Sequence, residues 1–222
     1  MSCCNQCLGI ERVFDEESAR RELWDYRRNG PAKETNWLIA AIREAGISPE
    51  MSLLDVGGGA GAIQHELAQA MTGRITNVDA SSSFLRVAQE EAQRLGYAGR
   101  AAYHHGNFVT IAPHLEPADI VTLDRVICCY HDMPGLVQAA AGRAGRYLGL
   151  VYPRDNWYVR PFLNLLNLYL RLRGSLFRTF LHANQQVDEL VRAAGFYPIF
   201  HRHSLAWRVD LYQRIGEDEF AS

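Results

Sequence analysis

Hydrophobic residues follow two different periods along this chain. Short apolar runs typical of buried strands occur at 53–54, 75–78 and 118–123, and stretches with helical spacing separate them. Strand and helix patterns alternate in this way from about residue 36 to residue 152. Because neighbouring parallel strands need a crossover helix between them, this alternation predicts a parallel sheet covered by helices on both faces.

The last part of the chain has a different pattern. Trp207, Val209 and Leu211 alternate with Arg, Asp and Tyr, which predicts a half-buried antiparallel strand. The overall prediction is an α/β fold, doubly wound, with a mostly parallel sheet whose last strand is reversed. With 222 residues and 48% hydrophobic content, the chain can bury one substantial core. We therefore expect one main domain over 34–222, preceded by an N-terminal segment at 1–33 that ends in a charged helix.

Glycines cluster directly after the first apolar run. The stretch from Asp55 to Gly61 reads Asp-Val-Gly-Gly-Gly-Ala-Gly, and a helix-like pattern follows it. Glycine permits a positive φ and lets the backbone come close to a ligand, and the first turn of a helix offers free N–H groups. This combination predicts a site for a nucleotide-like molecule. The candidate residues are Asp55, Gly57, Gly58, Gly59 and Gly61.

A carboxylate ends the second apolar run. Asp79 is followed by Ala80 and three serines, which open another helix pattern. In a doubly wound sheet, an acid at this position binds the ribose hydroxyls of a nucleotide cofactor. Asp79 and Ala80 are therefore further candidates for cofactor binding. The alternative for Asp79 is structural, with its side chain capping the next helix.

Two more segments lie at the expected ends of later strands. Gly-Asn107-Phe108 follows a third candidate strand, and Asp124-Arg125 follows the run at 118–123. Together with the D-x-G-x-G-x-G motif and Asp79, these segments resemble, in content and order, those of the class I S-adenosylmethionine (SAM)-dependent methyltransferases. The stretch at 127–137 is loosely similar to the branch that methylates quinone and tetrapyrrole precursors.

The resemblance implies a seven-stranded sheet, SAM as the cofactor and roles for several residues. In this family an acid after the third strand meets the adenine amino group, and the next aromatic residue packs on the adenine ring; here Asn107 and Phe108 hold those positions. In related enzymes an N-terminal helix folds over the cofactor, which makes Tyr26 a candidate contact to the methionine part. Asp124 and Arg125 are expected at the mouth of the site.

The acceptor is expected over the carboxyl ends of the fourth and fifth strands. His131 and His182 are the candidate bases, because imidazole titrates near neutral pH and can take a proton from a hydroxyl. The alternative for His131 is a loop histidine without a catalytic role. Asp124, Asp155 and Asn156 also resemble the oxygen ligands of Mg²⁺ in catechol-type methyltransferases, but Asn156 is equally suited to cap the following helix.

The segment at about 156–182 is predicted to be a helical insertion of unusual apolarity. Arg160, Asn164, Asn167 and Arg171 form a narrow polar stripe, and nearly all other positions of the helix are apolar. Such a helix is buried in the core, covers a greasy substrate as a lid, or lies on lipid. Peripheral membrane contact is therefore one of the expectations.

The charge distribution bears on the partners. A net charge of −2 argues against general nucleic-acid binding. Between residues 133 and 216, however, 11 Arg stand against 4 acidic residues. These arginines either only face solvent or attract an anionic acceptor or a membrane surface. We expect a hydrophobic, potentially anionic small molecule as the acceptor, methylated at oxygen, with carbon, nitrogen and sulfur as the other options.

The five cysteines are odd in number and bunched, unlike a disulfide framework. They favour a cytoplasmic location, and the sequence has neither a secretion signal nor a run long enough to span a membrane. The thiols are either inert packing residues or a pocket for a soft metal or metalloid; arsenite methyltransferases also use cysteines with this fold. The residues concerned are Cys3, Cys4, Cys7, Cys128 and Cys129.

Two functions of other classes compete with SAM-dependent methyl transfer. An NAD(P)-dependent oxidoreductase would reuse the glycine stretch and Asp79, but it also needs a hydride-transfer site such as a Tyr-x-x-x-Lys pair. Lys33 is the only lysine of the chain and precedes the first strand, which argues against this function. A SAM-binding protein without catalytic activity is the other alternative.

Overall fold

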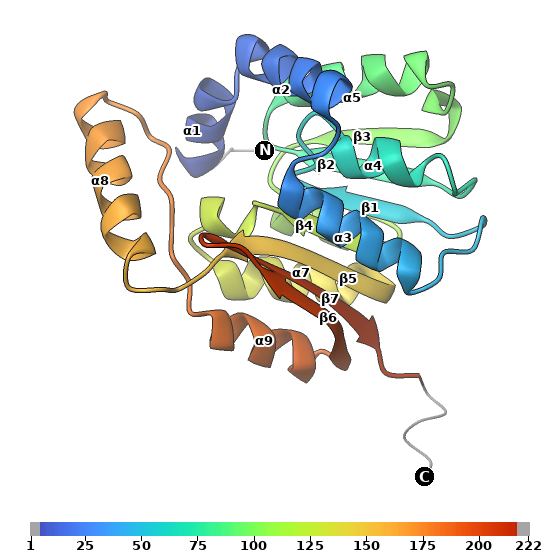
Figure 1. Cartoon of the computed structure of the whole chain (residues 1–222). Helices are drawn as coiled ribbons and strands as arrows, with labels where there is room; N and C mark the ends of the chain where they lie inside the picture. The colour runs from blue at the N-terminus through green and yellow to red at the C-terminus, as the bar shows by residue number, and fades with distance from the viewer. Residues whose placement is uncertain (1–4, 217–222) are drawn as a thin grey trace.

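The computed structural model describes residues 5–216, with side chains from residue 8 onward (Figure 1). The helices are α1 (Asn5–Val13), α2 (Glu16–Asn29), α3 (Lys33–Glu44), α4 (Ala62–Leu67), α5 (Ser82–Arg94), α6 (Phe108–Ile111), α7 (Met133–Arg143), α8 (Val159–Leu172) and α9 (Asn184–Ala193). The strands are β1 (Leu53–Val56), β2 (Ile75–Asp79), β3 (Ala101–His105), β4 (Ala118–Asp124), β5 (Ala144–Pro153), β6 (Phe196–His203) and β7 (Trp207–Arg214). Short 3-10 turns lie at Ala98–Arg100, Ala112–His114 and Ile127–Cys129.

The strands form one seven-stranded sheet in the order β3-β2-β1-β4-β5-β7-β6. β7 runs antiparallel to both of its neighbours, and the other neighbouring strands pair in parallel. The predicted doubly wound α/β fold with a reversed last strand is therefore confirmed. The strand order reverses between β1 and β4, and the crevice at the carboxyl ends of two such strands is where this class of sheet binds its ligands.

Two apolar clusters hold helices against opposite faces of the sheet. Successive side chains of a strand point to opposite faces. Leu53 and Ile120 accordingly belong to the cluster under α3 and α4, whereas Leu54 and Val121 belong to the cluster under α7 and α9. Each fully buried leucine of this kind contributes roughly 1.5–3 kcal/mol to the stability of the fold. Because this energy is lost if the strand turns over, the alternating pattern fixes which side of each strand faces which helices.

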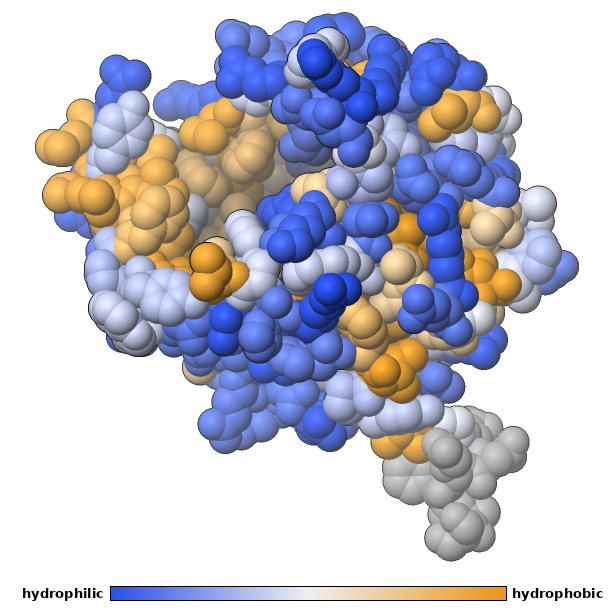
Figure 2. Space-filling model, in the orientation of Figure 1, coloured by the Kyte–Doolittle hydropathy of each residue, from blue (hydrophilic) through white to orange (hydrophobic). Residues whose placement is uncertain are grey.

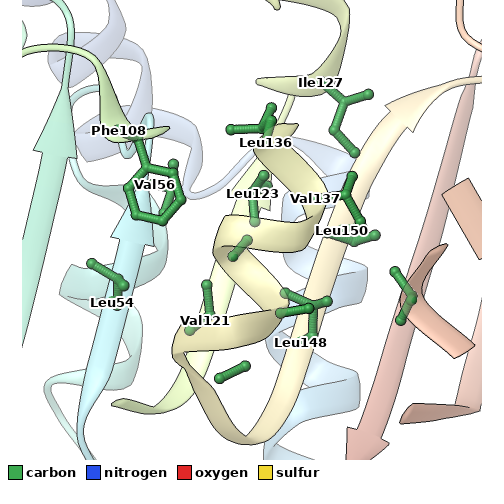
Figure 3. Close-up of a cluster of buried hydrophobic side chains, with 14 of the residues drawn as sticks. Leu54, Val56, Phe108, Val121, Leu123, Ile127, Leu136, Val137, Leu148 and Leu150 are labelled. Atoms are coloured by element: carbon green, nitrogen blue, oxygen red, sulfur yellow. The ribbon is translucent and has the colours of Figure 1, made fainter. Parts of the chain in front are cut away.

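Figure 3 shows the second of these clusters. Leu136 and Val137 point from α7 toward the strands that carry Leu123 and Leu150. Phe108, at the start of α6, packs at the edge of the same cluster. The cluster thus extends from the centre of the sheet to the carboxyl ends of its strands, where it becomes the floor of a cavity.

The last strand is more deeply buried than its sequence predicts. Val209 and Leu211 face α3, and Asp210 and Tyr212 on the other side of the strand are buried as well. The reason is its place in the sheet, because β7 lies between β5 and β6 and Tyr212 on its second face packs with α9. The buried carboxylate of Asp210 is compensated by a hydrogen bond from the hydroxyl of Tyr152 at 2.8 Å.

The N-terminal helices lie over the carboxyl ends of the strands (Figure 1). α2 begins after Asp15, whose Oδ1 accepts a hydrogen bond from the backbone N–H of Ser18 at 2.9 Å. It ends at Gly30, which has a φ of 75° that glycine adopts most readily. Leu23 of α2 packs with Phe84 of α5 in a small apolar cluster, and this contact attaches the predicted N-terminal helix to the sheet domain.

α8 occupies the place of the predicted insertion, between β5 and α9. It stands away from the sheet in Figure 1, and apart from Val159 its side chains are half-buried or exposed. The interpretation of this helix as part of the core is therefore wrong. Of the helices within residues 5–216, none combines the length and the apolarity that crossing a bilayer requires.

Candidate functional site

A cavity of about 840 Å³ opens at the carboxyl ends of the strands, beneath α1 and α2. This volume lies within the range of small-molecule sites. The sheet order places Asp79, at the end of β2, on one side of the glycine stretch. Arg125 after β4 and Trp207 at the start of β7 lie on the other side. The cavity therefore has two regions that meet above β1 and β4.

The glycine stretch joins β1 to α4 by a turn that excludes side chains. Gly57 and Gly59 have φ values of 61° and 56°, a region that costs other residues about 1–2 kcal/mol. At Gly58 a Cβ atom would lie 2.7 Å from Oδ2 of Asp55 and 2.8 Å from Nδ2 of Asn77. All three glycines line the cavity, so a ligand in this place would meet bare backbone.

Gly61 belongs to the same turn but does not line the cavity. It has a φ of 91°, and a Cβ atom there would clash with the side chains of Gln64 and His65. Nε2 of His65 donates to the carbonyl oxygen of Ala60 at 2.8 Å, and its Nδ1 is bonded to the hydroxyl of Tyr97. Burial lowers the pKa of His65 to about 4, so a neutral ring supports the turn. Sequence reasoning missed His65, because nothing in the helix pattern marks it as a support of the loop.

Asp79 lines the cavity at the carboxyl end of β2, with Ala80 beside it. Its two oxygens accept hydrogen bonds from the backbone N–H groups of Gly59 at 3.0 Å and Ser81 at 2.8 Å. Burial raises the pKa of Asp79 in spite of these bonds. The cap of α5 is Ser81, whose Oγ accepts from the N–H of Phe84 at 3.3 Å. The alternative in which Asp79 caps this helix is therefore wrong.

Two carboxylates of the adjacent strands β1 and β4 also line the cavity. Asp55 accepts a hydrogen bond from Thr122 at 2.8 Å, and Asp124 accepts one from Thr35 at 2.5 Å. Within residues 5–216, Oδ2 of Asp55 and Oδ1 of Asp124 have no hydrogen-bond donor. Burial raises the pKa of both groups, that of Asp55 to about 7. Buried oxygens without a donor are positions that a ligand's own donors can satisfy.

α2 contributes an acidic residue that sequence reasoning missed. The side chain of Glu22 lines the cavity, and its Oε1 accepts a hydrogen bond from the backbone N–H of Ala60 at 3.1 Å. Burial raises the pKa of Glu22, and the charges of Asp124 and Asp79 add to this effect. Because α2 carries charged residues on most of its surface, its sequence gives no sign of which one faces inward.

Tyr26, the predicted contact to the methionine part, lines the cavity one turn further along α2. Its hydroxyl donates a hydrogen bond to Oε1 of Glu66 at 3.2 Å, and its ring centre lies 5.5 Å from that of His65. Burial and the charge of Glu66 raise the pKa of Tyr26. The hydroxyl is therefore neutral and engaged, which leaves the ring as the part that a ligand would contact.

The cavity wall around the glycine stretch is acidic. SAM carries a sulfonium and an ammonium group beside a single carboxylate, so its net charge is positive. A nicotinamide dinucleotide instead carries a negatively charged pyrophosphate. An acidic wall attracts the first molecule and repels the second, so the residues present fit SAM and disfavour a dinucleotide. The acidic lining residues are Glu22, Asp25, Asp55, Asp79 and Asp124.

Asn107 and Phe108 line the cavity at the carboxyl end of β3, beyond β2 in the sheet order. Oδ1 of Asn107 accepts hydrogen bonds from the backbone N–H of Val109 at 3.1 Å and from the hydroxyl of Tyr130 at 2.7 Å. The first of these bonds caps α6. The amide oxygen that the resemblance assigns to the adenine amino group is thus shared with two donors of the protein.

Arg125 follows β4 in an uncommon conformation. Its φ of 61° is the only positive φ of a non-glycine residue within 5–216, and backbone strain of this kind clusters at functional sites. The guanidinium lies 3.7 Å from Glu34, 3.8 Å from Asp124 and 5.2 Å from the ring centre of Trp207. Both distances to carboxylates exceed that of a hydrogen bond, so its N–H groups are available to a ligand in the cavity.

One wall of the cavity is apolar and comes from α1 and the segment after α8. Phe14 and Phe177 pack edge to face with ring centres 5.5 Å apart, and the backbone of Phe177 leaves no room for a side chain at Gly9. Asn167 of α8 fixes the same segment, because it accepts from the N–H of Thr179 at 2.8 Å and donates to its carbonyl at 2.7 Å. Phe14, Phe177 and Thr179 line the cavity.

Cys128 and Cys129 line the cavity next to Arg125. Their Sγ atoms lie 3.8 Å apart without a disulfide bond, and the thiol of Cys128 donates to the carbonyl oxygen of Arg125 at 3.2 Å. Contact with Cys128 and burial raise the pKa of Cys129, which disfavours the thiolate that a soft metal requires. The side chains of the N-terminal cluster lie outside the described residues; they are Cys3, Cys4 and Cys7.

Asp155 and Asn156, which follow β5 and resemble metal ligands of catechol-type methyltransferases, do not line the cavity. Oδ2 of Asp155 accepts from the N–H of Asn184 at 3.0 Å, and Asn156 donates to the hydroxyl of Tyr158 at 2.8 Å. Across the described part of the chain, no group of three or more His, Cys, Asp or Glu side chains could hold a metal ion. The expected cap is also wrong, because α8 begins at Val159 after Tyr158 and no side chain caps it.

The predicted bases, His131 and His182, lie beside the cavity and outside its lining. His131 is exposed and stacks on the ring of Tyr130, with ring centres 5.7 Å apart. Nε2 of His182 donates to the carbonyl oxygen of Tyr130 at 2.9 Å, and burial lowers the pKa of this histidine. Both imidazoles therefore contact a residue of the cavity wall without reaching the cavity themselves.

Comparison with known proteins identifies the central part of the chain. Residues 47–148 match the model of a methyltransferase domain family. This part contains the glycine stretch, Asp79, Asn107 and Asp124. A search of curated proteins found no match.

Several solved structures share the fold. Magnesium protoporphyrin IX methyltransferase from Synechocystis PCC 6803, with bound SAM, is 16% identical, with a TM-score of 0.70 over 96% of this chain and 99% of that chain. Geranyl diphosphate methyltransferase, in complex with GPP and sinefungin, is 11% identical, with a TM-score of 0.67 over 82% and 77%. The pyocyanin biosynthetic protein is 19% identical, with a TM-score of 0.59 over 90% and 59%.

At these identities, the solved structures establish the fold. The family match adds the type of domain, and it covers the glycine turn and three of the five acids of the acidic cavity wall, Asp55, Asp79 and Asp124. From the sheet topology and this match together, we conclude that residues 47–148 are similar to a methyltransferase domain and that the chain has the Rossmann-like fold of the class I SAM-dependent methyltransferases.

Proposed function

We propose that this protein transfers the methyl group of SAM to an oxygen atom of a hydrophobic small molecule that carries a negative charge. The observation that carries this proposal is the division of one cavity into two regions. An acidic region surrounds the glycine stretch, and a second region combines Arg125 with apolar walls. The first suits a cationic cofactor, and the second suits an apolar anion.

The residues of the acidic region would hold SAM, which supplies a methyl group on a positively charged sulfur. Asp79 would accept hydrogen bonds from the ribose hydroxyls, and Asn107 and Phe108 would contact the adenine. The bare backbone at Gly57 to Gly59 leaves room for the rest of the molecule. Asp55 adds a buried oxygen without a donor, which favours a ligand that brings donors of its own.

The second region has the composition of a site for an apolar anion. Trp207 lies beside Arg125, Phe14 and Phe177 are further apolar residues of the cavity lining, and Arg125 and Lys33 are its basic residues. A guanidinium with available N–H groups binds a carboxylate or phosphate by two parallel hydrogen bonds. Geranyl diphosphate, which is present with a methyltransferase of the same fold, is a molecule of this kind.

An ionised oxygen as the acceptor would need no base. Within the described chain no histidine lines the cavity, and a carboxylate is a nucleophile at neutral pH without first losing a proton. The work of the protein is then to align the two reactants, which alone can lower the barrier by several kcal/mol. We therefore favour a carboxylate, or an oxygen of similar acidity, over a neutral alcohol.

A neutral hydroxyl acceptor is the second candidate, and it keeps His131 and His182 as proposed bases. Both contact Tyr130, so a shift of this one residue would open a path from either imidazole to the cavity. General base catalysis of this type contributes about 10²–10⁴-fold. The two candidates therefore differ in the effect of removing the histidines.

Transfer to a thiol or metalloid is a further option, because Cys128 and Cys129 line the cavity. The raised pKa of Cys129 makes it the weaker option. The proposed cytoplasmic location rests on the five cysteines, which are odd in number and bunched. A SAM-binding protein without catalytic activity is the last alternative, and a measurement of methyl transfer distinguishes it from all of these options.

The first test is calorimetric titration with SAM, S-adenosylhomocysteine and NADH. Binding of the two adenosyl compounds without NADH supports the cofactor assignment. The acceptor is then sought with methyl-labelled SAM and a panel of hydrophobic carboxylic acids, each paired with its alcohol and thiol. Labelling of the acids supports the proposal, and labelling of the alcohols or thiols alone contradicts it. Tight SAM binding without any labelling would favour the protein without turnover.

A further inference from the structure

Helix α8 has two apolar faces, and only one of them packs on the protein. Val159 is buried, and Leu163, Leu166 and Leu170 are half-buried on the side of the body. At 3.6 residues per turn, the remaining apolar side chains share an arc of about 120° that points away from the body. This exposed face of α8 consists of Phe162, Leu165, Leu168, Tyr169 and Leu172, which are 65%, 66%, 51%, 54% and 79% exposed.

Aromatic and apolar side chains extend this face at the start of the helix. Trp157 is 84% exposed and Leu205, in the turn between β6 and β7, is 81% exposed. The hydroxyl of Tyr158 donates to the carbonyl oxygen of Leu205 at 2.6 Å, which holds the turn beside the helix. Figure 2 shows the apolar surface gathered over α8, next to a hollow in the molecule. Tryptophan and tyrosine favour the boundary between lipid headgroups and hydrocarbon.

The segment of the chain that carries the exposed face has only positively charged side chains among Arg, Lys, Asp and Glu. Residues 156–187 contain four arginines and no aspartate or glutamate. Arg160 and Arg171 lie along one border of the exposed face, which follows from their helical spacing. Arg173 lies along the other border, with its guanidinium 5.7 Å from the ring centre of Tyr169. Arginines on both borders of an apolar arc complement a surface that is apolar below and anionic above.

We propose that the exposed face of α8 binds the surface of an anionic membrane. A second copy of the chain suits this face less well, because symmetric contact would bring the arginines of both copies together. A single helix that stands off the sheet, as the ribbon shows (Figure 1), presents its exposed apolar face as a ridge. Such a ridge can sink into a lipid surface, whereas a protein partner would have to supply the entire groove.

The position of α8 connects this surface to the cavity. Asn167, on the same helix, holds Thr179 by two hydrogen bonds, and Thr179 and Phe177 line the cavity. A helix bound to the membrane therefore places the apolar cavity wall close to the lipid. An apolar acceptor would pass between the lipid and the cavity without crossing water. This passage of the acceptor rests on the proposed function, whereas membrane binding by α8 does not.

The test is flotation of the full chain with vesicles of phosphatidylcholine, alone or with about a third phosphatidylglycerol. We expect flotation with the anionic vesicles and its loss in high salt. Leu165→Glu should reduce the bound fraction about tenfold or more. It removes a leucine from the exposed face of α8, which the membrane would bury, and adds a charge there. Arg171→Gln/Arg173→Gln should weaken binding to anionic vesicles about tenfold or more, at about fivefold per arginine.

Leu95→Glu is the matched control, since it makes the same change at an exposed leucine of another helix end. It should float like the unchanged protein. Leu165→Glu should keep the melting temperature and the SAM affinity, because its side chain already faces solvent. The proposal is overturned if the unchanged protein does not float, or if Leu165→Glu floats equally well. A concentration-dependent dimer that Leu165→Glu abolishes would also overturn it, since a second copy would then cover the face.

Discussion

Oδ2 of Asp79 accepts a hydrogen bond from the backbone N–H of Gly59 at 3.0 Å. The contact joins the carboxyl end of β2 to the turn after β1, across 20 residues of chain. It links the proposed ribose-binding acid to the turn that leaves room for the methionine part. A change at Asp79 therefore acts on two parts of the cofactor region at once.

Replacement of Asp79 by alanine should weaken SAM binding about tenfold to a hundredfold, because charge-assisted hydrogen bonds worth roughly 1.5–3 kcal/mol are lost. Asp79→Asn keeps an acceptor for Gly59 and should lose less. Calorimetry measures the SAM affinity of both variants. Glu90→Ala, which removes an exposed acid, is the control. An unchanged affinity in a folded Asp79→Ala protein would refute the ribose assignment.

Glu22→Ala should also weaken SAM binding, by about tenfold, although this residue lies on the N-terminal helix α2. The substitution leaves the N–H of Ala60 without its acceptor and loosens the contact between α2 and the glycine turn. Hydrogen exchange of the Ala60 amide should speed up in the same variant. Glu17→Ala, at an exposed site of the same helix, should change neither value; equal behaviour of the two variants would contradict the role of Glu22.

Asp55 makes stability depend on pH in a direction opposite to most carboxylates. Its pKa rises from 3.8 to about 7 on folding, chiefly through burial, so the folded protein binds more protons than the unfolded chain between these values. Stability from this group is fully present below about pH 4 and is lost as the pH rises through about 7. The isosteric Asp55→Asn cannot ionise, so its advantage over the unchanged protein should grow by roughly 1–4 kcal/mol over this range.

Urea unfolding of both proteins at several pH values measures this difference. Asp119→Asn is a suitable control, because Asp119 accepts hydrogen bonds from Ser52 at the opposite end of the strands. A constant difference between Asp55→Asn and the unchanged protein would mean that Asp55 stays ionised in the folded state.

Arg125 combines a positive φ with a proposed contact to the acceptor, and two variants separate these properties. Arg125→Gly and Arg125→Ala both remove the guanidinium and should raise KM for an anionic acceptor equally. Only glycine relieves the backbone, so Arg125→Gly should be more stable than Arg125→Ala by about 1 kcal/mol. Thermal and urea unfolding test the second statement. Equal stability of the two variants would show that the φ of 61° carries no cost.

His131→Ala and His182→Ala distinguish an ionised acceptor from a neutral one. If the acceptor is a carboxylate, each variant should keep kcat within about threefold and leave its pH profile unchanged, since no proton is removed. A loss of about a hundredfold or more, with disappearance of the acid-side limb of the pH profile, would assign the base role to that histidine and reject the ionised acceptor.

The fold was largely predictable from the sequence, because it depends on local pattern. Alternating apolar runs and helical stretches predicted the parallel sheet, and the glycines after Asp55 predicted the turn at the end of its first strand. These features arise from steric limits and burial that act on neighbouring residues. The burial of both faces of β7 was not predictable, because it depends on which strands flank it.

The site divides in the same way. Asp79, Asn107 and Asp124 could be named as candidates because each follows an apolar run directly. Glu22 and His65 could not, because their roles depend on how helices pack over the turn. The separation of His131 from the cavity is likewise a property of packing.

The sequence by itself determined that α8 is too apolar for an ordinary surface helix, and left open a core, a lid and a membrane contact. Only the tertiary structure decided that one apolar face packs on the body while a second stays exposed beside arginines. The physical reason is that periodicity reports the apolar width of a helix. What covers each part of that width depends on contacts between residues far apart in the chain.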